Sequence, residues 1–417
     1  MKMLKLTALA LLGAGTAVAA EGPVPTGVPR LDHVFVVMME NHGYSQIIGN
    51  PNAPFVNEYA RRANLATNYF AVAHPSLTNY LEVTGGSNFG VLNDNAPDWH
   101  DASCAPNLAT GQTSLDNGSN ALAGEPICPI SGKGTDAATP AIDCSNEVSA
   151  PPCENNIDGM RSIPASSNIV GKTIADQLVA AGRRWKSYQE NLPLGGADNV
   201  NFSDGEYSNL TDFASILPQL NPPLSTGDVV QLYAAKHDPF VYFRSVQESE
   251  RPHLGLAEVV PFDGPRGLYA DLASGRVPDY SFIVPNQCND QHGRGNAGPF
   301  CNFDPTDDGT QAGLNPALIQ LGDNAIRRLV DAIHGSPTWE EGRSVIVVTW
   351  DENDYSAAPN INKVVTIVET SYGRSGVQSD TYYNHYSLLR TIEAGFGLPC
   401  LNHACDRGVD VMSDLFR

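Results

Sequence analysis

The sequence predicts an α/β fold, a three-layer α/β/α sandwich in which helices cover both faces of a mostly parallel central sheet. Two continuous apolar runs, Val34–Met39 and Ser344–Trp350, have the composition of strands that are buried on both faces of such a sheet. Strand-like segments alternate with helical ones along the chain, as in layered α/β folds. Each run is followed directly by an acidic residue, Glu40 or Asp351, where open α/β sheets bind their ligands.

The other elements follow from local patterns in chain order. Short runs rich in β-branched and aromatic residues predict further strands at residues 65–72, 184–188, 280–284 and 364–368. Longer segments with apolar residues at helical spacing predict helices at residues 54–62, 75–84, 173–183, 315–334 and 385–395. The helix at 75–84 begins with Ser, Thr and Asn residues, which favour helix starts. We expect one domain, residues 21–417.

The first twenty residues have the pattern of a secretory signal. Lys2 and Lys5 precede the apolar stretch Leu6–Val18, and Ala17–Ala19 fits a cleavage site. The stretch is too short to span a bilayer as a helix, and a buried N-terminal helix is the alternative. We therefore expect a secreted or periplasmic protein.

The formal net charge of −21 limits the classes of molecule that the protein is expected to bind. Such a charge argues against nucleic-acid binding and against stable association with an anionic membrane. The oligomeric state is left open by the sequence. A negatively charged substrate would need local positive charge, from a metal ion or from basic side chains.

Eight cysteines suit an oxidising compartment. Of about 105 possible connectivities, we expect pairs between neighbours in the sequence. These pairs are Cys144–Cys153, Cys288–Cys301, Cys400–Cys405 and, as the remainder, Cys104–Cys128. Four of the cysteines lie in residues 94–165, a segment rich in Pro, Gly, Ser and Asn. We expect a loop-rich, disulfide-stapled insertion, either a lid over the site or a peripheral addition.

Oxygen ligands at the ends of two buried strands suggest a site for a hard cation and a phosphate ester as substrate. A third segment carries Ser76 at the point where a strand gives way to a helix. Helix N-terminal N–H groups stabilise an anion there, which suits a nucleophilic hydroxyl. The alternative is that Ser76 is a plain N-cap, since serine is a favoured residue at that position.

Several motifs occur in order between about residue 31 and residue 400. They are Glu40-Asn41, His74-Pro75-Ser76-x-x-Asn79-Tyr80, Lys236-His237-Asp238-Pro239-Phe240, Asp290-x-His292, Thr349-x-Asp351-Glu352 and Asn384-His385-Tyr386-Ser387. Together they resemble the phosphoesterase family of secreted acid phosphatases and phosphatidylcholine-type phospholipases C, in the alkaline phosphatase superfamily. The compact length and the His-Pro-Ser version are closer to the acid phosphatase branch.

The resemblance implies a role for each matching residue and an alkaline-phosphatase-like fold. The implied metal ligands are Glu40, Asn41, Ser76, Asp351, Glu352 and, for a second ion or the phosphate, Asp290. The implied catalytic residues are Ser76 as nucleophile, His292 and His385. The expected substrate-binding residues are Asn79, His237, Lys236 and His74. The wider superfamily often has Asp-His where this chain has Asp351-Glu352.

A first shell made of oxygen atoms suits Mg²⁺, Ca²⁺ or Mn²⁺, with Zn²⁺ as the alternative, and we expect one ion rather than two. The expected function is a secreted, metal-dependent acid phosphatase that hydrolyses small phosphate monoesters through a phosphoserine intermediate. A phospholipase C or another phosphodiesterase is the runner-up, and a non-catalytic binding protein is a third hypothesis. A sulfatase is disfavoured because the segment at Ser76 lacks the Cys/Ser-x-Pro-x-Arg pattern.

Overall fold

The computed structural model describes residues 21–89, 91, 169, 171–192, 232–247, 249, 251–294, 297–353 and 362–417. The expected signal segment, the insertion at 94–165 and the cysteine pairs Cys104–Cys128 and Cys144–Cys153 lie outside the described residues. Two of the four predicted disulfides, Cys288–Cys301 and Cys400–Cys405, are confirmed.

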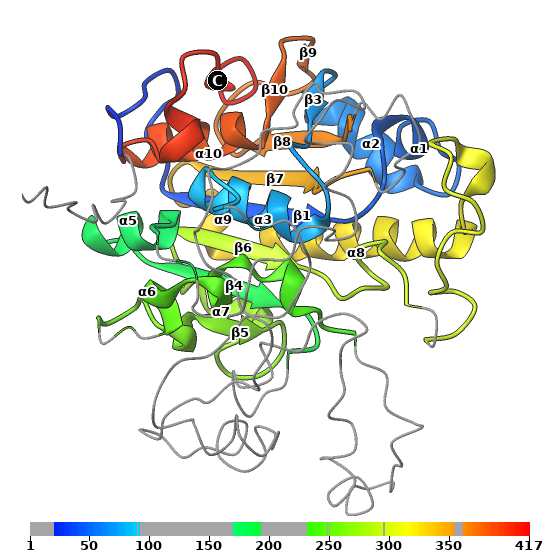
Figure 1. Cartoon of the computed structure of the whole chain (residues 1–417), viewed down its shortest axis with the longest axis horizontal. Coiled ribbons are helices and arrows are strands. Elements are labelled where there is room, and N and C mark those ends of the chain that lie inside the picture. The colour runs from blue at the N-terminus through cyan, green and yellow to red at the C-terminus, as the bar shows by residue number, and fades with distance from the viewer. Residues whose placement is uncertain are drawn as a thin grey trace, which may run out of the picture.

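A mostly parallel sheet forms the middle layer (Figure 1). Its eight strands, in spatial order, are β5 (Val259–Pro261), β4 (Trp185–Gln189), β6 (Tyr280–Val284), β1 (His33–Met39), β7 (Ser344–Trp350), β8 (Thr366–Thr370), β2 (Asn64–Ala66) and β9 (Gln378–Ser379). β8 runs antiparallel to both of its neighbours, and the remaining pairings are parallel. Two short strands, β3 (Tyr69–Phe70) and β10 (Tyr383–Asn384), form a second, parallel pair.

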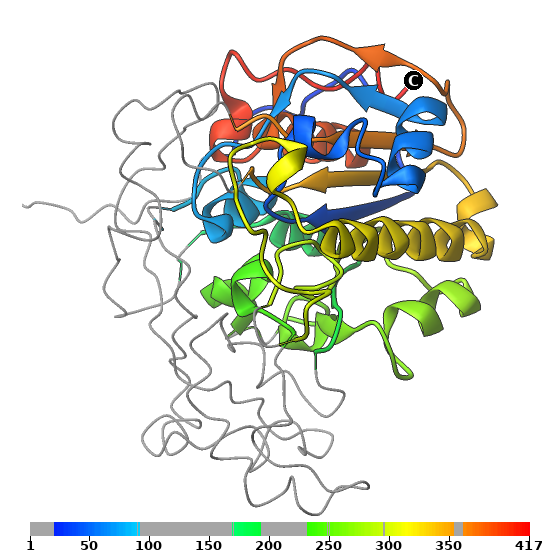
Figure 2. The same ribbon diagram turned by 90° about the vertical axis from the view of Figure 1, so that its right-hand side faces the viewer.

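Helices cover both faces of the sheet, so the predicted three-layer sandwich is confirmed. The α-helices are α1 (Tyr44–Ile47), α2 (Pro54–Arg62), α3 (Ser76–Gly85), α5 (Ile174–Ala180), α6 (Arg244–Gln247), α7 (Leu268–Ser274), α8 (Pro316–His334), α9 (Pro337–Glu340) and α10 (His385–Phe396). Helices α2 and α8 pack against each other, as do α3 and α10. Figure 2 shows α2 and α8 in front of the sheet and α10 behind it.

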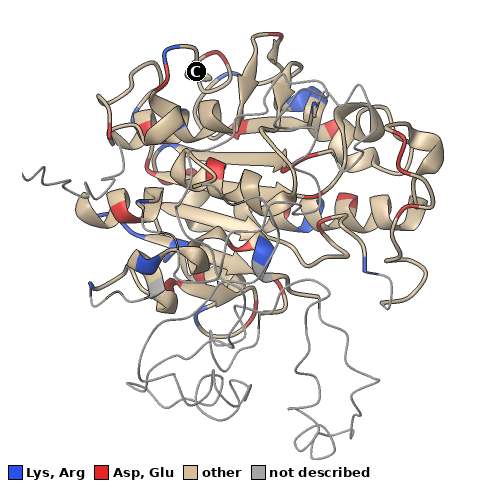
Figure 3. Ribbon diagram, viewed as in Figure 1, with Lys and Arg blue, Asp and Glu red and all other residues tan. Residues whose placement is uncertain are grey.

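Burial of the central strands explains their apolar sequences. Every residue of β1 after His33, and every residue of β6 and β7, is buried. None of these three strands carries Lys, Arg, Asp or Glu, and charged residues lie mostly on helices and loops (Figure 3). Because both faces of a central strand are covered, the period-two alternation of a half-exposed strand is absent.

The predicted strand at residues 65–72 is wrong in one respect, because the structure divides it into β2 and β3. Thr67, between the two, donates from its N–H and its hydroxyl to the carbonyl of Ser379, at 2.7 and 2.8 Å. Asn68 donates to the carbonyl of Asp380 at 3.3 Å. These bonds join the residues after β2 to Ser379 of β9 and to Asp380 directly after it, and beyond them β3 pairs with β10 in place of the main sheet.

Within the described part of the chain, no helix has the length and apolar character needed to cross a membrane.

Glu393 on α10 generates a prediction about stability and pH. Burial raises the pKa of its carboxyl well above the ordinary value, and the Leu401 N–H and the Arg390 charge oppose this only in part. Because the folded state binds this proton more tightly than the unfolded chain, stability falls as pH rises from the unfolded-state pKa towards the raised one, by up to about 1.4 kcal/mol per pH unit. Glu393→Gln keeps an acceptor for the Leu401 N–H, which lies 2.9 Å from Oε1, and should remove that loss.

The measurement is the urea midpoint of the wild type and of Glu393→Gln at about pH 5 and about pH 7.5, with the disulfides intact. Glu341→Gln, at an exposed position, is the matched control and should follow the wild type. Parallel pH profiles for the wild type and Glu393→Gln would contradict the prediction.

Candidate active site

Three loops meet at the carboxyl ends of the central strands. The register pairs Met39 of β1 with Trp350 of β7, so Glu40 and Asp351 leave the sheet side by side. The loop after β6 joins them, because the Glu40 N–H donates to the carbonyl of Asp290 at 2.9 Å. Glu40, Asp290 and Asp351 are all fully buried. The structure therefore brings together three carboxylates that lie far apart in the sequence.

One carboxylate fixes the turns that follow β1 and β7. Asp351 Oδ1 accepts from the N–H of Asn41 at 3.1 Å and from the N–H of Glu352 at 2.7 Å. Asn41 has a φ of 56°, in the left-handed region that Asn tolerates better than most residues with a side chain. Asn41 and Glu352 are therefore held in place from both strands by a single side chain.

Ser76 is the first residue of α3, and Pro75 occupies the N-cap position. The plain N-cap interpretation of Ser76 is therefore wrong. Its Oγ lies 3.2 Å from Glu40 Oε2 and 3.5 Å from Glu352 Oε1. The hydroxyl therefore lies at the positive end of a helix, where N–H groups can stabilise an anion, and faces two carboxylates.

Asn79 and His74 hold Glu352. Asn79 Nδ2 donates to Glu352 Oε2 at 3.0 Å and to the carbonyl of Ala73 at 2.8 Å. Its Oδ1 accepts from the N–H groups of Val72 and Ala73, both at 3.0 Å. His74 Nδ1 lies 2.9 Å from Glu352 Oε2. These contacts orient Glu352 and shape the loop that leads into α3.

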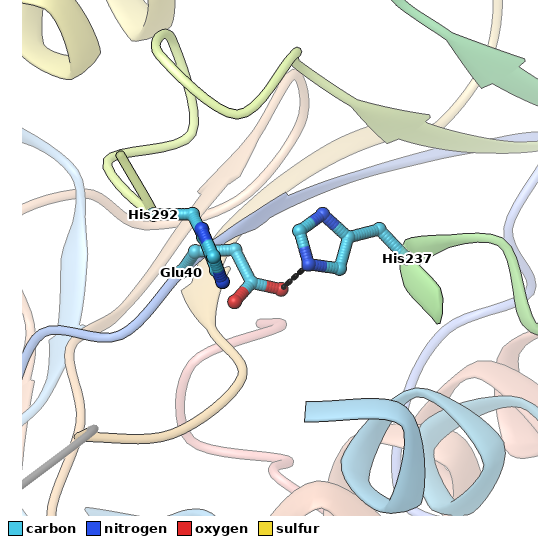
Figure 4. Close-up of side chains that lie close together, drawn as sticks. All are labelled: Glu40, His237 and His292. Carbon is cyan, nitrogen blue, oxygen red and sulfur yellow. Dashed lines mark ion pairs between the residues drawn. The ribbon is translucent and has the colours of Figure 1, made fainter. Parts of the chain in front are cut away.

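Two histidines and a lysine face the carboxylates. His237, at the end of the short 3₁₀ helix Ala235–His237, lies between Glu40 Oε1, 3.1 Å from its Nε2, and Asp290 Oδ2, 3.2 Å from its Nδ1. One ligand atom each from Glu40, His237 and His292 lies within 4.8 Å of the others, and Figure 4 shows the three side chains converging. Lys236 Nζ is 3.1 Å from His292 Nε2. Lys236 brings positive charge beside the acids.

His385, the first residue of α10, contacts the site through the backbone of Asp351. Its Nε2 lies 2.7 Å from the Asp351 carbonyl, so this nitrogen donates, and Nδ1 accepts from the Tyr69 hydroxyl at 3.0 Å. Burial lowers the pKa of His385 to about 4. A neutral imidazole engaged at both nitrogens makes a positioning contact, which differs from the expected catalytic one.

The electrostatics of the site favour an added cation. Burial, then the charge of Asp351, raises the pKa of Glu40 well above its ordinary value, and burial, then the charge of Glu352, does the same for the pKa of Asp351. Lys236 opposes both shifts. Burial, then the charge of Lys236, lowers the pKa of His237. Buried carboxylates beside a neutral imidazole are a ligand set that a divalent cation stabilises.

Buried oxygen atoms give independent support for this fit. Among the described residues, Asn41 Oδ1 and Asp351 Oδ2 are buried acceptors with no hydrogen-bond partner. Buried polar atoms of this kind are rare and costly unless something else satisfies them. Carboxylate and amide oxygens are ligands for hard cations, so the residues present fit a divalent metal ion.

Sequence reasoning assigned no role to several residues that support the site. The ring of Tyr80 stacks on His237, with centroids 5.3 Å apart. His42 connects two parts of the site. Its Nδ1 lies 3.0 Å from the Glu40 carbonyl oxygen, and its Nε2 lies 2.9 Å from Asp304 Oδ2. Tyr80 lies one helical turn after Ser76 and belongs to a motif already recognised, whereas the partner of His42 lies 262 residues away.

A model of the phosphoesterase family matches residues 50–299 and 313–399. The chain belongs to the phosphoesterase family. Membership makes it a phosphoric ester hydrolase, as the sequence motifs predicted. The matched range includes Ser76, His237, His292 and Asp351, whereas Glu40 and Asn41 precede it, so these two enter the site on geometry.

Curated relatives of this phosphoesterase carry related names. The phosphatidylinositol-3-phosphatase of Mycobacterium tuberculosis is 24% identical over 93% of this chain and 84% of its own length. An acid phosphatase of Aspergillus fumigatus is 23% identical over 91% of this chain, but the match spans 57% of the fungal protein. Phospholipase C A of Mycobacterium tuberculosis is 23% identical over 44% of this chain and 35% of its own length.

Solved structures similar to this phosphoesterase include a protein of the alkaline phosphatase superfamily from Vibrio parahaemolyticus. It has a TM-score of 0.43 and 14% identity over 91% of this chain and 69% of that protein. A lipoteichoic acid synthase from Listeria monocytogenes has a TM-score of 0.41 and 10% identity over 95% of this chain and 79% of that protein.

Asn79→Ala tests the positioning role of this amide. Asn79 is fully buried, and its loss leaves the N–H groups of Val72 and Ala73 without their side-chain acceptor, so we expect a loss of about 2–4 kcal/mol in the free energy of unfolding. Urea denaturation measures it. The matched control is Asn52→Ala, which loses one 3.2 Å bond to Gln320 at the surface. Equal losses in the two variants would contradict the role given to Asn79.

Proposed function

We propose that this phosphoesterase is a secreted, metal-dependent acid phosphatase that hydrolyses phosphate monoesters through a phosphoserine intermediate. The observation that carries the proposal is the position of Ser76, at the N-terminus of α3 with its Oγ 3.2 Å from Glu40 and 3.5 Å from Glu352. A nucleophile, a ligand set for a cation and an anion-stabilising helix end meet there.

The ligands proposed for the ion are Glu40, Asn41, Asp351 and Glu352, with Ser76 at the same centre. When bound, a divalent cation lowers the pKa of a coordinated hydroxyl and offsets the negative charge of a phosphate group. The oxygen-rich set favours Mg²⁺, Ca²⁺ or Mn²⁺. Zn²⁺ stays a candidate, because His237 and His292 add nitrogen ligands beside Glu40. Asp290 would serve a second ion.

The proposed chemistry has two steps. Ser76 Oγ attacks phosphorus, its proton passes to a neighbouring acceptor, and the bond from phosphorus to the alcohol oxygen breaks. The leaving oxygen takes a proton from His292, and the same imidazole then removes a proton from the water that hydrolyses the phosphoserine. The water oxygen bonds to phosphorus as the bond from phosphorus to Ser76 Oγ breaks, and Oγ recovers its proton from the acceptor that took it in the first step, so phosphate is released and the hydroxyl is restored.

The remaining predicted residues divide into two groups. Lys236 and His237 face the reaction centre and are proposed to hold the phosphate oxygens, with the α3 N–H groups. Asn79, His74 and His385 are proposed to act on the ligands, the first two through Glu352 and the third through the Asp351 backbone. This replaces the direct substrate contacts and the catalytic role expected for them from the sequence.

Monoester preference, an acidic optimum and secretion are proposals supported by the names of the fungal relatives, which are acid phosphatases, and by the signal-like residues 1–20. The second candidate is a phospholipase C or another phosphodiesterase that uses the same Ser76 site, favoured by the match to phospholipase C A.

Ser76→Ala should abolish turnover of p-nitrophenyl phosphate, because no other group supplies the attacking oxygen in the proposed mechanism. Removal of a nucleophile typically costs several orders of magnitude in kcat. Acid-quenched wild-type enzyme should carry phosphate on Ser76, detected by mass spectrometry of the tryptic peptide. Ser274→Ala, a hydroxyl on the surface of α7, is the control and should leave turnover unchanged. Turnover retained by Ser76→Ala would exclude Ser76 as nucleophile.

A substrate panel separates the two candidate functions. We expect p-nitrophenyl phosphate to be hydrolysed faster than bis-p-nitrophenyl phosphate and p-nitrophenyl phosphorylcholine, with the rate highest at acidic pH. EDTA should remove the activity, and added Mg²⁺, Ca²⁺, Mn²⁺ or Zn²⁺ in turn should identify the ion that restores it. Preference for the diester or the phosphorylcholine ester would move the assignment to the second candidate.

A further inference from the structure

The loop that follows β6 carries Asp290 and His292 and is fixed to the rest of the site at two points. Cys288 and Cys301 form a disulfide across it. Asp304 Oδ2 lies 2.9 Å from His42 Nε2, and Asp304 Oδ1 accepts from the N–H of Asn315 at 2.6 Å. Residues 302 and 303 thus lie between the disulfide at Cys301 and the contact of Asp304 with His42, in the turn after β1.

Phe303 lies between these two anchors with its side chain in solvent. It is 52% exposed, yet its backbone packs closely on Gly293. A Cβ added to Gly293, which has a φ of 90°, would lie 3.2 Å from the Cα and N of Phe303 and 3.2 Å from its ring atom Cδ1. The backbone of Phe303 is therefore packed against the turn at Gly293, next to His292.

The ring of Phe303 borders the candidate active site. Its centroid is 6.0 Å from that of the His292 imidazole, with an angle of 70° between the planes, an edge-to-face contact. His292 in turn belongs to the group with Glu40 and His237. If the phosphate of an ester binds beside Glu40, His237 and His292, the organic portion of the ester extends within reach of the Phe303 ring.

Exposure alone carries no function, since single apolar side chains are common on protein surfaces. Among the described residues, four large hydrophobic side chains are exposed, and two of them, Phe300 and Phe303, lie on this loop. Phe300 is 51% exposed, and no ring contact joins it to His292 in the described part of the chain. The contact with His292 singles out Phe303.

We propose that Phe303 is a specificity-determining residue that contacts the alcohol portion of the phosphate ester and favours aromatic or other planar apolar groups over small polar ones. This inference rests on the proposed function. Aromatic surfaces attract one another through edge-to-face and offset-stacked contacts in addition to the apolar area that they bury. A small hydrated alcohol such as glycerol gains little from the same ring.

The test compares kcat/KM for phenyl phosphate and for glycerol 2-phosphate. Phe303→Ala should lower the value for phenyl phosphate about five-fold, which corresponds to about 1 kcal/mol, mostly through KM, and should leave glycerol 2-phosphate within about two-fold. Phe303→Tyr should retain the wild-type preference, because it keeps the ring. Phe300→Ala, with the same exposure on the same loop, is the matched control and should behave as the wild type.

The outcomes distinguish this inference from the proposed function. An unchanged ratio between the two substrates in Phe303→Ala would overturn the inference, as would an equal loss for both substrates, which indicates a structural role for the residue. Hydrolysis of neither ester by the metal-supplied wild type would overturn the proposed function, and the inference with it. Circular dichroism of each variant reports whether the fold is kept.

Discussion

The pairing of β1 with β7 is the constraint on which the site depends. Met39 lies opposite Trp350 in the parallel register, so Glu40 and Asp351 emerge together although 310 residues separate their turns. A shift of one residue would exchange the two faces of the strand and would separate the carboxylates. The register between the two buried strands therefore holds the two carboxyl groups close enough to influence each other electrostatically.

The cost of that contact explains the surroundings. Two buried carboxylates repel each other and have lost the stabilising effect of water. Lys236 offsets part of the repulsion, the Asn41 and Glu352 N–H groups bind one carboxylate, and His237 faces the other. Among the described residues, Asn41 Oδ1 and Asp351 Oδ2 are buried without a hydrogen-bond partner, and a bound cation would satisfy both. The same concentration of negative charge that is unfavourable in the fold would favour the binding of a positively charged ligand.

Much of this arrangement could be predicted from the sequence, because the information is local. The apolar runs of β1 and β7 identify buried parallel strands, and residues directly after such strands share one edge of the sheet. Other features depend on distant partners. His385 is implied to be catalytic by the sequence motif, yet its partners are Tyr69 and the Asp351 carbonyl. The antiparallel direction of β8 and the position of Phe303 beside His292 likewise follow from tertiary packing, which no local pattern encodes.

The two anchors of the loop after β6 separate two kinds of change in this molecule. The disulfide and the Asp304–His42 contact lie on either side of residues 302 and 303, both of which are exposed. A substitution of Phe303 would change a side chain beside His292 and leave both anchors of the loop in place. If Phe303 contacts the alcohol portion of the ester as proposed, a single substitution there could change substrate preference during evolution without a change at the residues proposed for catalysis.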